Sequence, residues 1–242
     1  MDRDVMVGFG GKQAWLAVRD GDPAEVLAVL GLRDLGDVPW RDGIDLAHLT
    51  DDRVAVTPPL PGANGSTWVL AVGRFLLRPD TSVDLTDLSK RLQTEVQFFV
   101  THRVTETHRW QRAADGTLLR AFGYVGQTGD VTSWYGDPDE VELATGLPAT
   151  YRIDDDDTDA GAPLDEENAD LAAPLDESML ASLDDELTRL LDDGGEGGIG
   201  EDAPAVLVSE QDVLRVAQGW SIDPTRLDGR QAPGPLRIGA AA

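Results

Sequence analysis

The sequence predicts an α+β protein in which an antiparallel sheet carries its helices on one face. Two observations favour this class. Short apolar stretches bounded by Gly, Pro, Asn and Asp recur along residues 1–150, and two of the intervening segments space their apolar residues as a helix does. The resulting order is strand, helix, strand, strand, helix, strand, then further strands. This is the βαββαβ order of a ferredoxin-like sandwich, extended by extra C-terminal hairpin strands.

The first predicted strand is the apolar stretch at residues 12–20, which ends in the turn signal DGDP. A helix is expected over residues 23–30. Asp22 is its N-cap, a proline follows at the first helical position, and Gly31 ends it. Residues 32–49 are rich in Asp, Gly and Pro, so they are expected to form a loop with one helical turn near its end.

Two further strands, residues 53–60 and 66–77, are expected to pair through a loop that contains the turn signal Asn64–Gly65. The next segment, residues 82–93, is predicted to be helical because its leucines recur at helical spacing. Strand-like stretches separated by turn signals such as Asp-Gly then follow, at residues 95–104, 106–113, 117–126 and 131–136.

Residues 151–202 differ from the rest of the chain, because they hold 19 Asp or Glu and 2 Arg, a net charge of −17. This composition predicts an acidic, largely disordered insertion. Within it, leucines spaced on one helical face predict a short amphipathic helix at about residues 178–192. Such a helix would contact either the body of the protein or a protein partner. The candidate partner-binding residues are Leu180, Leu183, Asp184, Asp185, Glu186 and Leu187.

Residues 203–230 return to a globular composition. Ser209 is a good N-cap with an acidic residue three positions on, and an apolar stripe that ends in Trp220 follows. We expect this part to form a strand and a helix that pack back on a domain of residues 1–150. Residues 231–242 are expected to be a disordered tail.

Composition excludes several classes of protein. The chain has 242 residues and no Cys, which rules out disulfides and thiolate chemistry. Its net charge of −25 disfavours nucleic-acid binding and permits a basic protein partner. Apolar stretches are too short to span a bilayer and no signal peptide is evident, so we expect no membrane association and a cytoplasmic location. No motif predicts a cofactor.

The stretch THRVTETH contains the candidate metal ligands His102, Glu106 and His108. Two histidines and a carboxylate are a donor set that zinc accepts. On one flat strand they would share a face but extend over about 13 Å, too far to surround an ion. A turn near Thr105 could gather them, although it would also break the register that puts them on one face. Cross-strand pairing of His, Glu and Arg on a solvated sheet face is the favoured interpretation.

Four matching pieces give the chain a family resemblance: a DPxEVLxxLG helix at Asp22–Gly31, a WxLxVG strand at Trp68–Gly73, a DG hairpin at Asp115–Gly116 and a GxPD turn at Gly136–Asp139. Over roughly residues 1–145 the chain resembles small α/β proteins of actinobacteria that are similar to immunity or accessory factors of toxin and secretion loci. The shared pieces are turns and strands, so the resemblance implies no catalytic residues.

These observations favour a non-enzymatic protein-binding module, of the immunity or accessory-protein kind, that engages a basic partner through its acidic segment. The supporting features are the uneven charge and the lack of a catalytic motif such as GxSxG. Two alternatives stay open at this point. One is a metal-dependent hydrolase that uses His102, Glu106 and His108. The other is a structural subunit of a larger assembly.

Overall fold

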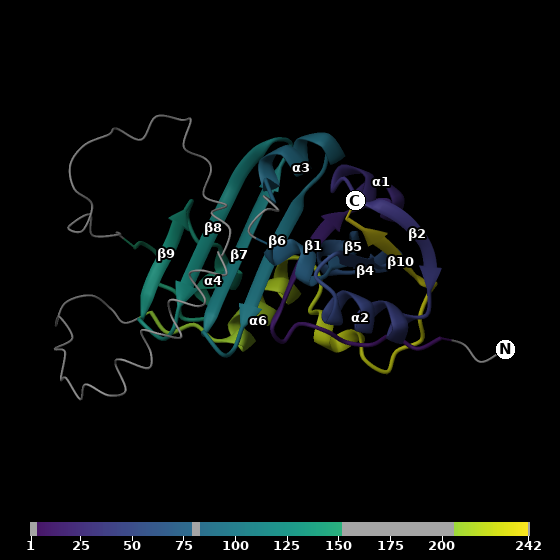
Figure 1. Cartoon of the computed structure of the whole chain (residues 1–242). Helices are drawn as coiled ribbons and strands as arrows, with labels where there is room; N and C mark the ends of the chain where they lie inside the picture. Colours follow the sequence, from purple (N-terminus) through teal and green to yellow (C-terminus); the bar gives the residue numbers. More distant parts are fainter. Residues whose placement is uncertain (1–3, 79–82, 152–205, 242) are drawn as a thin grey trace.

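A computed structural model describes residues 4–78, 83–151 and 206–241 of the chain. These residues form an α+β structure built on one ten-stranded sheet, in which paired strands are antiparallel (Figure 1). The strand order is β2-β10-β3-β5-β1-β6-β7-β8-β9, and β4 pairs with β5. The strands are β1 (Gln13–Arg19), β2 (Arg33–Val38), β3 (Arg53–Val56), β4 (Leu60–Pro61), β5 (Thr67–Val72), β6 (Val96–His102), β7 (Thr107–Ala114), β8 (Thr117–Val125), β9 (Asp130–Tyr135) and β10 (Leu236–Ala240).

Helices pack on both faces of the sheet, which corrects the prediction that they lie on one face. Helices α1 and α3 contribute to the core on one face, and α2, α4 and α6 pack on the other. The reason is that the central strands β1 and β5 bury successive residues on both faces, so a single helical layer could not cover them. The helices are α1 (Pro23–Val29), α2 (Trp40–Leu49), α3 (Leu85–Leu92), α4 (Glu140–Leu143) and α6 (Glu210–Trp220).

The segment predicted to be a loop between the first helix and the next strand instead contains β2 and α2. Strand β2 lies at the edge of the sheet and is mostly exposed, so its sequence lacks a strong apolar alternation. In α2, Trp40, Ile44 and Ala47 are buried at helical spacing on one face. These two elements separate α1 from β3, so the order of elements along the chain is not the predicted one.

The C-terminal residues predicted to be a disordered tail form β10, a strand inside the sheet. It pairs with β2 on one side and with β3 on the other. Leu236, Ile238 and Ala240 are buried, while Arg237 between them binds Asp34 of β2 (Nε–Oδ2 2.8 Å). Proline, glycine and alanine surround this short stretch, and its partners lie far away in sequence, so no local pattern indicated a strand.

The hairpin strands β7, β8 and β9 extend the sheet beyond β6, and β9 is the edge strand opposite β2. Asp115 and Gly116, both at positive φ, form the two-residue turn between β7 and β8. Helix α6 packs on β6 and β7, and Val213, Val216, Ala217 and Trp220 of this helix are buried. Residues 206–209, in the region where a strand was predicted, form none, although Val206 is buried.

Residues 152–205 lie outside the described part of the chain. The predicted helix at 178–192 and the candidate partner-binding residues, Leu180 to Leu187, belong to that range. Among the described helices, none is long and apolar enough to cross a membrane.

Candidate functional site

The candidate metal ligands do not converge. His102 pairs with Thr107 across the β6–β7 hairpin, whereas His108 pairs with Thr101. Because paired residues share a face and successive residues alternate, the two imidazoles leave the sheet on opposite faces. Glu106 lies in the turn between them, at positive φ. Within the described ranges, no group of three or more His, Asp or Glu could hold a metal ion. The structure therefore brings no metal site together from this set.

His108 is a core residue and does not lie on a solvated face. Its side chain is 3% exposed, and Nδ1 has no hydrogen-bond partner among the described residues. Burial lowers the pKa of His108, although the carboxylates of Glu210, Glu106 and Asp212 partly oppose that shift. The imidazole is therefore neutral near pH 7 and serves to fill the sheet face near the first turn of α6.

A second polar cluster, under α4, is fully enclosed. Arg120 and Glu142 form an ion pair (Nε–Oε1 2.8 Å) in which both side chains are 0% exposed. Trp110 Nε1 donates to the same carboxylate oxygen at 2.6 Å, and the other oxygen accepts from the backbone N of Asp139 at 3.1 Å. The Arg120 guanidinium also lies 4.4 Å from the ring centre of Trp134. A substrate could not reach these groups, so the cluster fastens α4 to β7 and β8 and is structural.

A cavity of about 520 Å³ lies beside the glycine-rich turn at Gly8–Gly11. Several of its polar lining groups bond to one another. Gly10 N donates to Gln13 Oε1 at 2.9 Å, Gln13 Nε2 lies 3.2 Å from His48 Nδ1, and Glu210 pairs with Arg103 (Oε2–Nε 3.6 Å). None of these contacts joins a nucleophile to a base, so they support no reaction.

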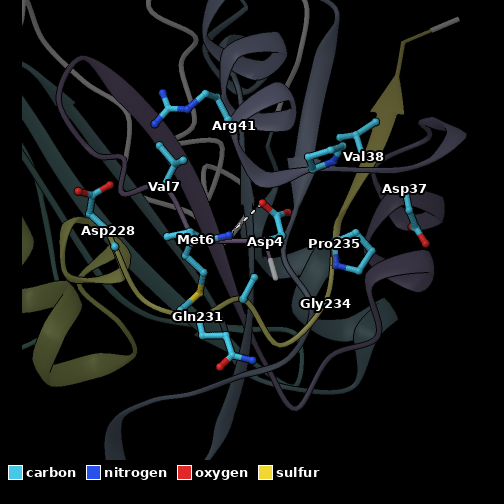
Figure 2. A pocket seen from close by; sticks show the side chains of 14 residues that line it. Asp4, Met6, Val7, Asp37, Val38, Arg41, Asp228, Gln231, Gly234 and Pro235 are labelled. Atoms are coloured by element: carbon cyan, nitrogen blue, oxygen red, sulfur yellow. Dashed lines mark hydrogen bonds between the residues drawn. The ribbon is translucent and has the colours of Figure 1, made fainter. Parts of the chain in front are cut away.

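The strongest candidate site is a larger open groove of about 1140 Å³, which we call the acidic groove (Figure 2). Three segments line it: Asp4–Val7, the β2–α2 connection from Asp37 to Arg41, and the loop from Asp228 to Pro235. The first and third segments are joined by backbone hydrogen bonds, Met6 N to Arg230 O at 2.8 Å and Gly229 N to Met6 O at 3.1 Å. The groove is thus made by the two ends of the chain meeting beside α2.

Two of its three aspartates also hold the groove together. Asp4 Oδ2 accepts from Trp40 N at 2.9 Å, so it caps α2, whose own N-cap residue Pro39 has no side-chain hydrogen bond. A carboxylate at a helix N-terminus is favoured by the helix dipole. Asp228 Oδ1 accepts from Gly8 N at 3.1 Å. The second oxygen of Asp228 and the whole carboxylate of Asp37 are left for a ligand.

Charge and apolar surface are combined in the groove. Figure 2 shows Asp228 and Asp37 on opposite sides, with Asp4 and Met6 between them. Arg41 is the one basic residue in the described lining, against three carboxylates. Met6, Val38 and Pro235 supply apolar surface. A ligand with cationic groups at both ends and an apolar middle would match this arrangement.

Sequence reasoning missed the acidic groove. Its carboxylates, Asp4, Asp37 and Asp228, are spread from one end of the chain to the other, and none lies in a motif. The part of the sequence that could have pointed to it is the β10 region, because only the return of the C-terminus into the sheet brings Asp228 near Asp4.

In comparisons with models of known protein families, with curated proteins and with solved structures, nothing matches this chain.

Proposed function

We propose that this chain is a non-enzymatic protein-binding module, of the immunity or accessory-protein kind, that engages a basic segment of a partner protein. The observation that carries the proposal is the acidic groove, in which Asp4, Asp37 and Asp228 surround an apolar floor. The chain's net charge of −25 would also speed the approach of a cationic partner. The acidic segment at residues 151–202 adds a second region that attracts the same partner.

The polar clusters elsewhere in the described residues are either enclosed or bonded to one another. They offer no accessible reactive group, which favours a binding role over catalysis. Arg120 and Glu142 are inaccessible, and His102 and His108 lie on opposite faces of the sheet. The groove is open and joins charged rims to apolar surface, a combination that suits an extended peptide with basic and apolar side chains in alternation.

A synthetic ten-residue peptide of alternating Arg and Val, with blocked ends, tests this function. Nuclear magnetic resonance of the isotope-labelled full chain should show shifts at Asp4–Val7, Asp37–Arg41 and 228–235. A matched Glu/Val peptide should cause none. Raising NaCl to about 0.5 M should weaken binding, because salt screens exposed charges.

The variant Asp37→Lys should weaken binding of the Arg/Val peptide by about tenfold, a loss of about 1.4 kcal/mol. Asp37 suits this test because it is exposed and makes no side-chain bond within the described residues. Glu140→Lys, which makes the same charge change at an exposed residue of α4, is the control and should leave the affinity nearly unchanged. Equal affinities for the two variants, or shifts confined to residues 154–202, would contradict the groove as the binding site.

For the architecture, we infer that the centre of the sheet is a ferredoxin-like unit into which β2 and α2 are inserted. Strands β3, β5, β1 and β6 are neighbours in that order, and α1 and α3 contribute to the core on one face. This is the arrangement expected of a βαββαβ sandwich once the inserted pair is set aside. Cross-strand amide contacts of β1 with both β5 and β6, measured by nuclear magnetic resonance, would test the assignment.

A further inference from the structure

A row of polar side chains crosses the outer strands on the sheet face that carries α1 and α3. Arg109 of β7 pairs with Gly123 of β8, and Gly123 pairs with Ser133 of β9, so the three residues share one face. Gln111, two residues along β7, lies on the same face. We call the surface formed by these four residues the Arg109 face. Helix α3 packs on this side of the sheet at the hairpin end, where Gly116 N donates to Ser89 Oγ.

The Arg109 face is shielded from solvent at Gln111 and Ser133, which are 5% and 4% exposed, whereas Arg109 itself is half-buried. Ser133 Oγ has no hydrogen bond with any described residue. Neither Arg109 nor Gln111 makes a side-chain hydrogen bond or ion pair with any described residue. Burial lowers the pKa of Arg109, and no carboxylate of the described residues opposes the shift.

Such groups indicate a surface that another segment completes. Ser133 Oγ is a buried hydroxyl without a partner among the described residues, and such a group destabilises the fold by about 1–3 kcal/mol. The half-buried guanidinium of Arg109 beside it offers five N–H donors. Carboxylates are the strongest complement, because they can accept two hydrogen bonds from one arginine.

We propose that the acidic segment of this chain, residues 154–202, docks on the Arg109 face and supplies the missing carboxylates. Charge complementarity favours it, since this segment contains 19 Asp or Glu and one Arg, a net charge of −18. Its point of departure favours it too. Tyr151, the last residue described before the segment, lies 5.4 Å, centre to centre, from the ring of Trp134 on edge strand β9. Trp134 faces the α6 side of the sheet, so the segment has one sheet edge to pass before it reaches the Arg109 face.

Because the acidic segment belongs to the same chain, its docking on the Arg109 face is favoured over binding of a separate molecule. Residues 152–205 can extend over about 3.3 Å each, so they can readily pass around the β9 edge. A tethered segment also binds at an effective concentration in the millimolar range, so weak individual contacts suffice. Docking of residues 154–202 on the Arg109 face requires no partner protein. A basic partner would compete with Arg109 for the same carboxylates.

Limited proteolysis of the full chain with a glutamate-specific protease tests the docking. The reference is a synthetic peptide of residues 154–202, and mass spectrometry locates each cut. In the wild-type protein, cleavage within 154–202 should be at least about tenfold slower than in the peptide. An equal rate in the two would overturn the proposal without any variant.

The variant Arg109→Met should raise the cleavage rate within 154–202 towards that of the peptide, and Arg109→Lys should restore part of the protection because it keeps the charge. Arg33→Met, which removes an exposed arginine from edge strand β2, is the matched control and should leave the rate unchanged. Circular dichroism verifies that each variant is folded. A folded Arg109→Met protein with the wild-type cleavage rate would overturn the proposal.

Discussion

Buried polar residues of this protein differ in how their charge is compensated. Arg120 and Glu142 pair with each other and are further bonded by Trp110 and by backbone groups, although Arg120 Nη2 has no hydrogen-bond partner among the described residues. Arg109 is half-buried and has no carboxylate partner in the described residues. A buried ion pair adds little stability by itself, but a buried charge left alone is costly. The first pair therefore belongs to the scaffold, and Arg109 marks a surface that needs a complement.

His108 makes stability depend on pH. Its pKa is lowered in the folded protein from an ordinary value near 6.5, so the unfolded chain binds a proton that the folded chain does not. The free energy of unfolding should therefore fall as the pH decreases below about 6.5, by at most about 1.4 kcal/mol per pH unit from this residue.

Denaturant titrations of wild type and His108→Gln between pH 7.5 and 5.5 would measure this dependence. The variant should show a shallower decline of the free energy of unfolding with falling pH. Identical slopes for wild type and His108→Gln would contradict the prediction.

At the scale of elements, sequence patterns succeeded where a local signal was strong. The N-cap at Asp22 accepts from Ala24 N at 2.8 Å and starts α1 as predicted, and the Asp115–Gly116 turn joins β7 to β8. Strand β2 and strand β10 were missed because an exposed edge strand and a short stretch of small residues carry no clear periodicity. The metal ligands were spaced plausibly in sequence, but the hairpin register separates His102 from His108.

Asp139 joins two elements and should be sensitive to mutation. Its side chain accepts from Val141 N at 3.0 Å and Glu142 N at 3.1 Å as the N-cap of α4, and from Trp220 Nε1 of α6 at 2.7 Å. Asp139→Ala should lower the free energy of unfolding by about 2 kcal/mol, which combines a lost cap with a lost hydrogen bond from Trp220.

Chemical denaturation measures the effect of Asp139→Ala, and Asp137→Ala in the same loop is the control because Asp137 is exposed. The control should change stability by less than about 0.5 kcal/mol. A loss at Asp139 no larger than that at Asp137 would mean that α4 and α6 are held by packing alone.

Across the whole molecule, residues near the two ends of the chain meet to form the acidic groove beside the sheet. Strand β10 closes the sheet between β2 and β3, and the loop before it builds the acidic groove against Asp4–Val7. Sheet closure and groove formation therefore depend on the same C-terminal residues. A groove made in this way is lost whenever the C-terminal strand leaves the sheet.

Removing residues 235–242 should abolish cooperative unfolding, because it deletes an interior strand and separates β2 from β3. Ile238→Asp should act in the same direction, since it places a charge at a side chain that is 2% exposed. Arg237→Ala, at the neighbouring residue on the opposite face, should cost no more than about 1 kcal/mol. Thermal denaturation followed by circular dichroism distinguishes these results; a truncated protein with a wild-type transition would show that β10 is dispensable.

The sequence by itself determined the α+β class, the helix caps, the hairpin turns and the acidic character of residues 151–202, because propensity, capping and charge act between neighbours along the chain. Tertiary structure alone decided that helices cover both faces, that the C-terminus enters the sheet, and that Asp4, Asp37 and Asp228 share a groove. Those outcomes depend on contacts between residues that are up to about two hundred positions apart, and such contacts leave no periodic trace in the sequence.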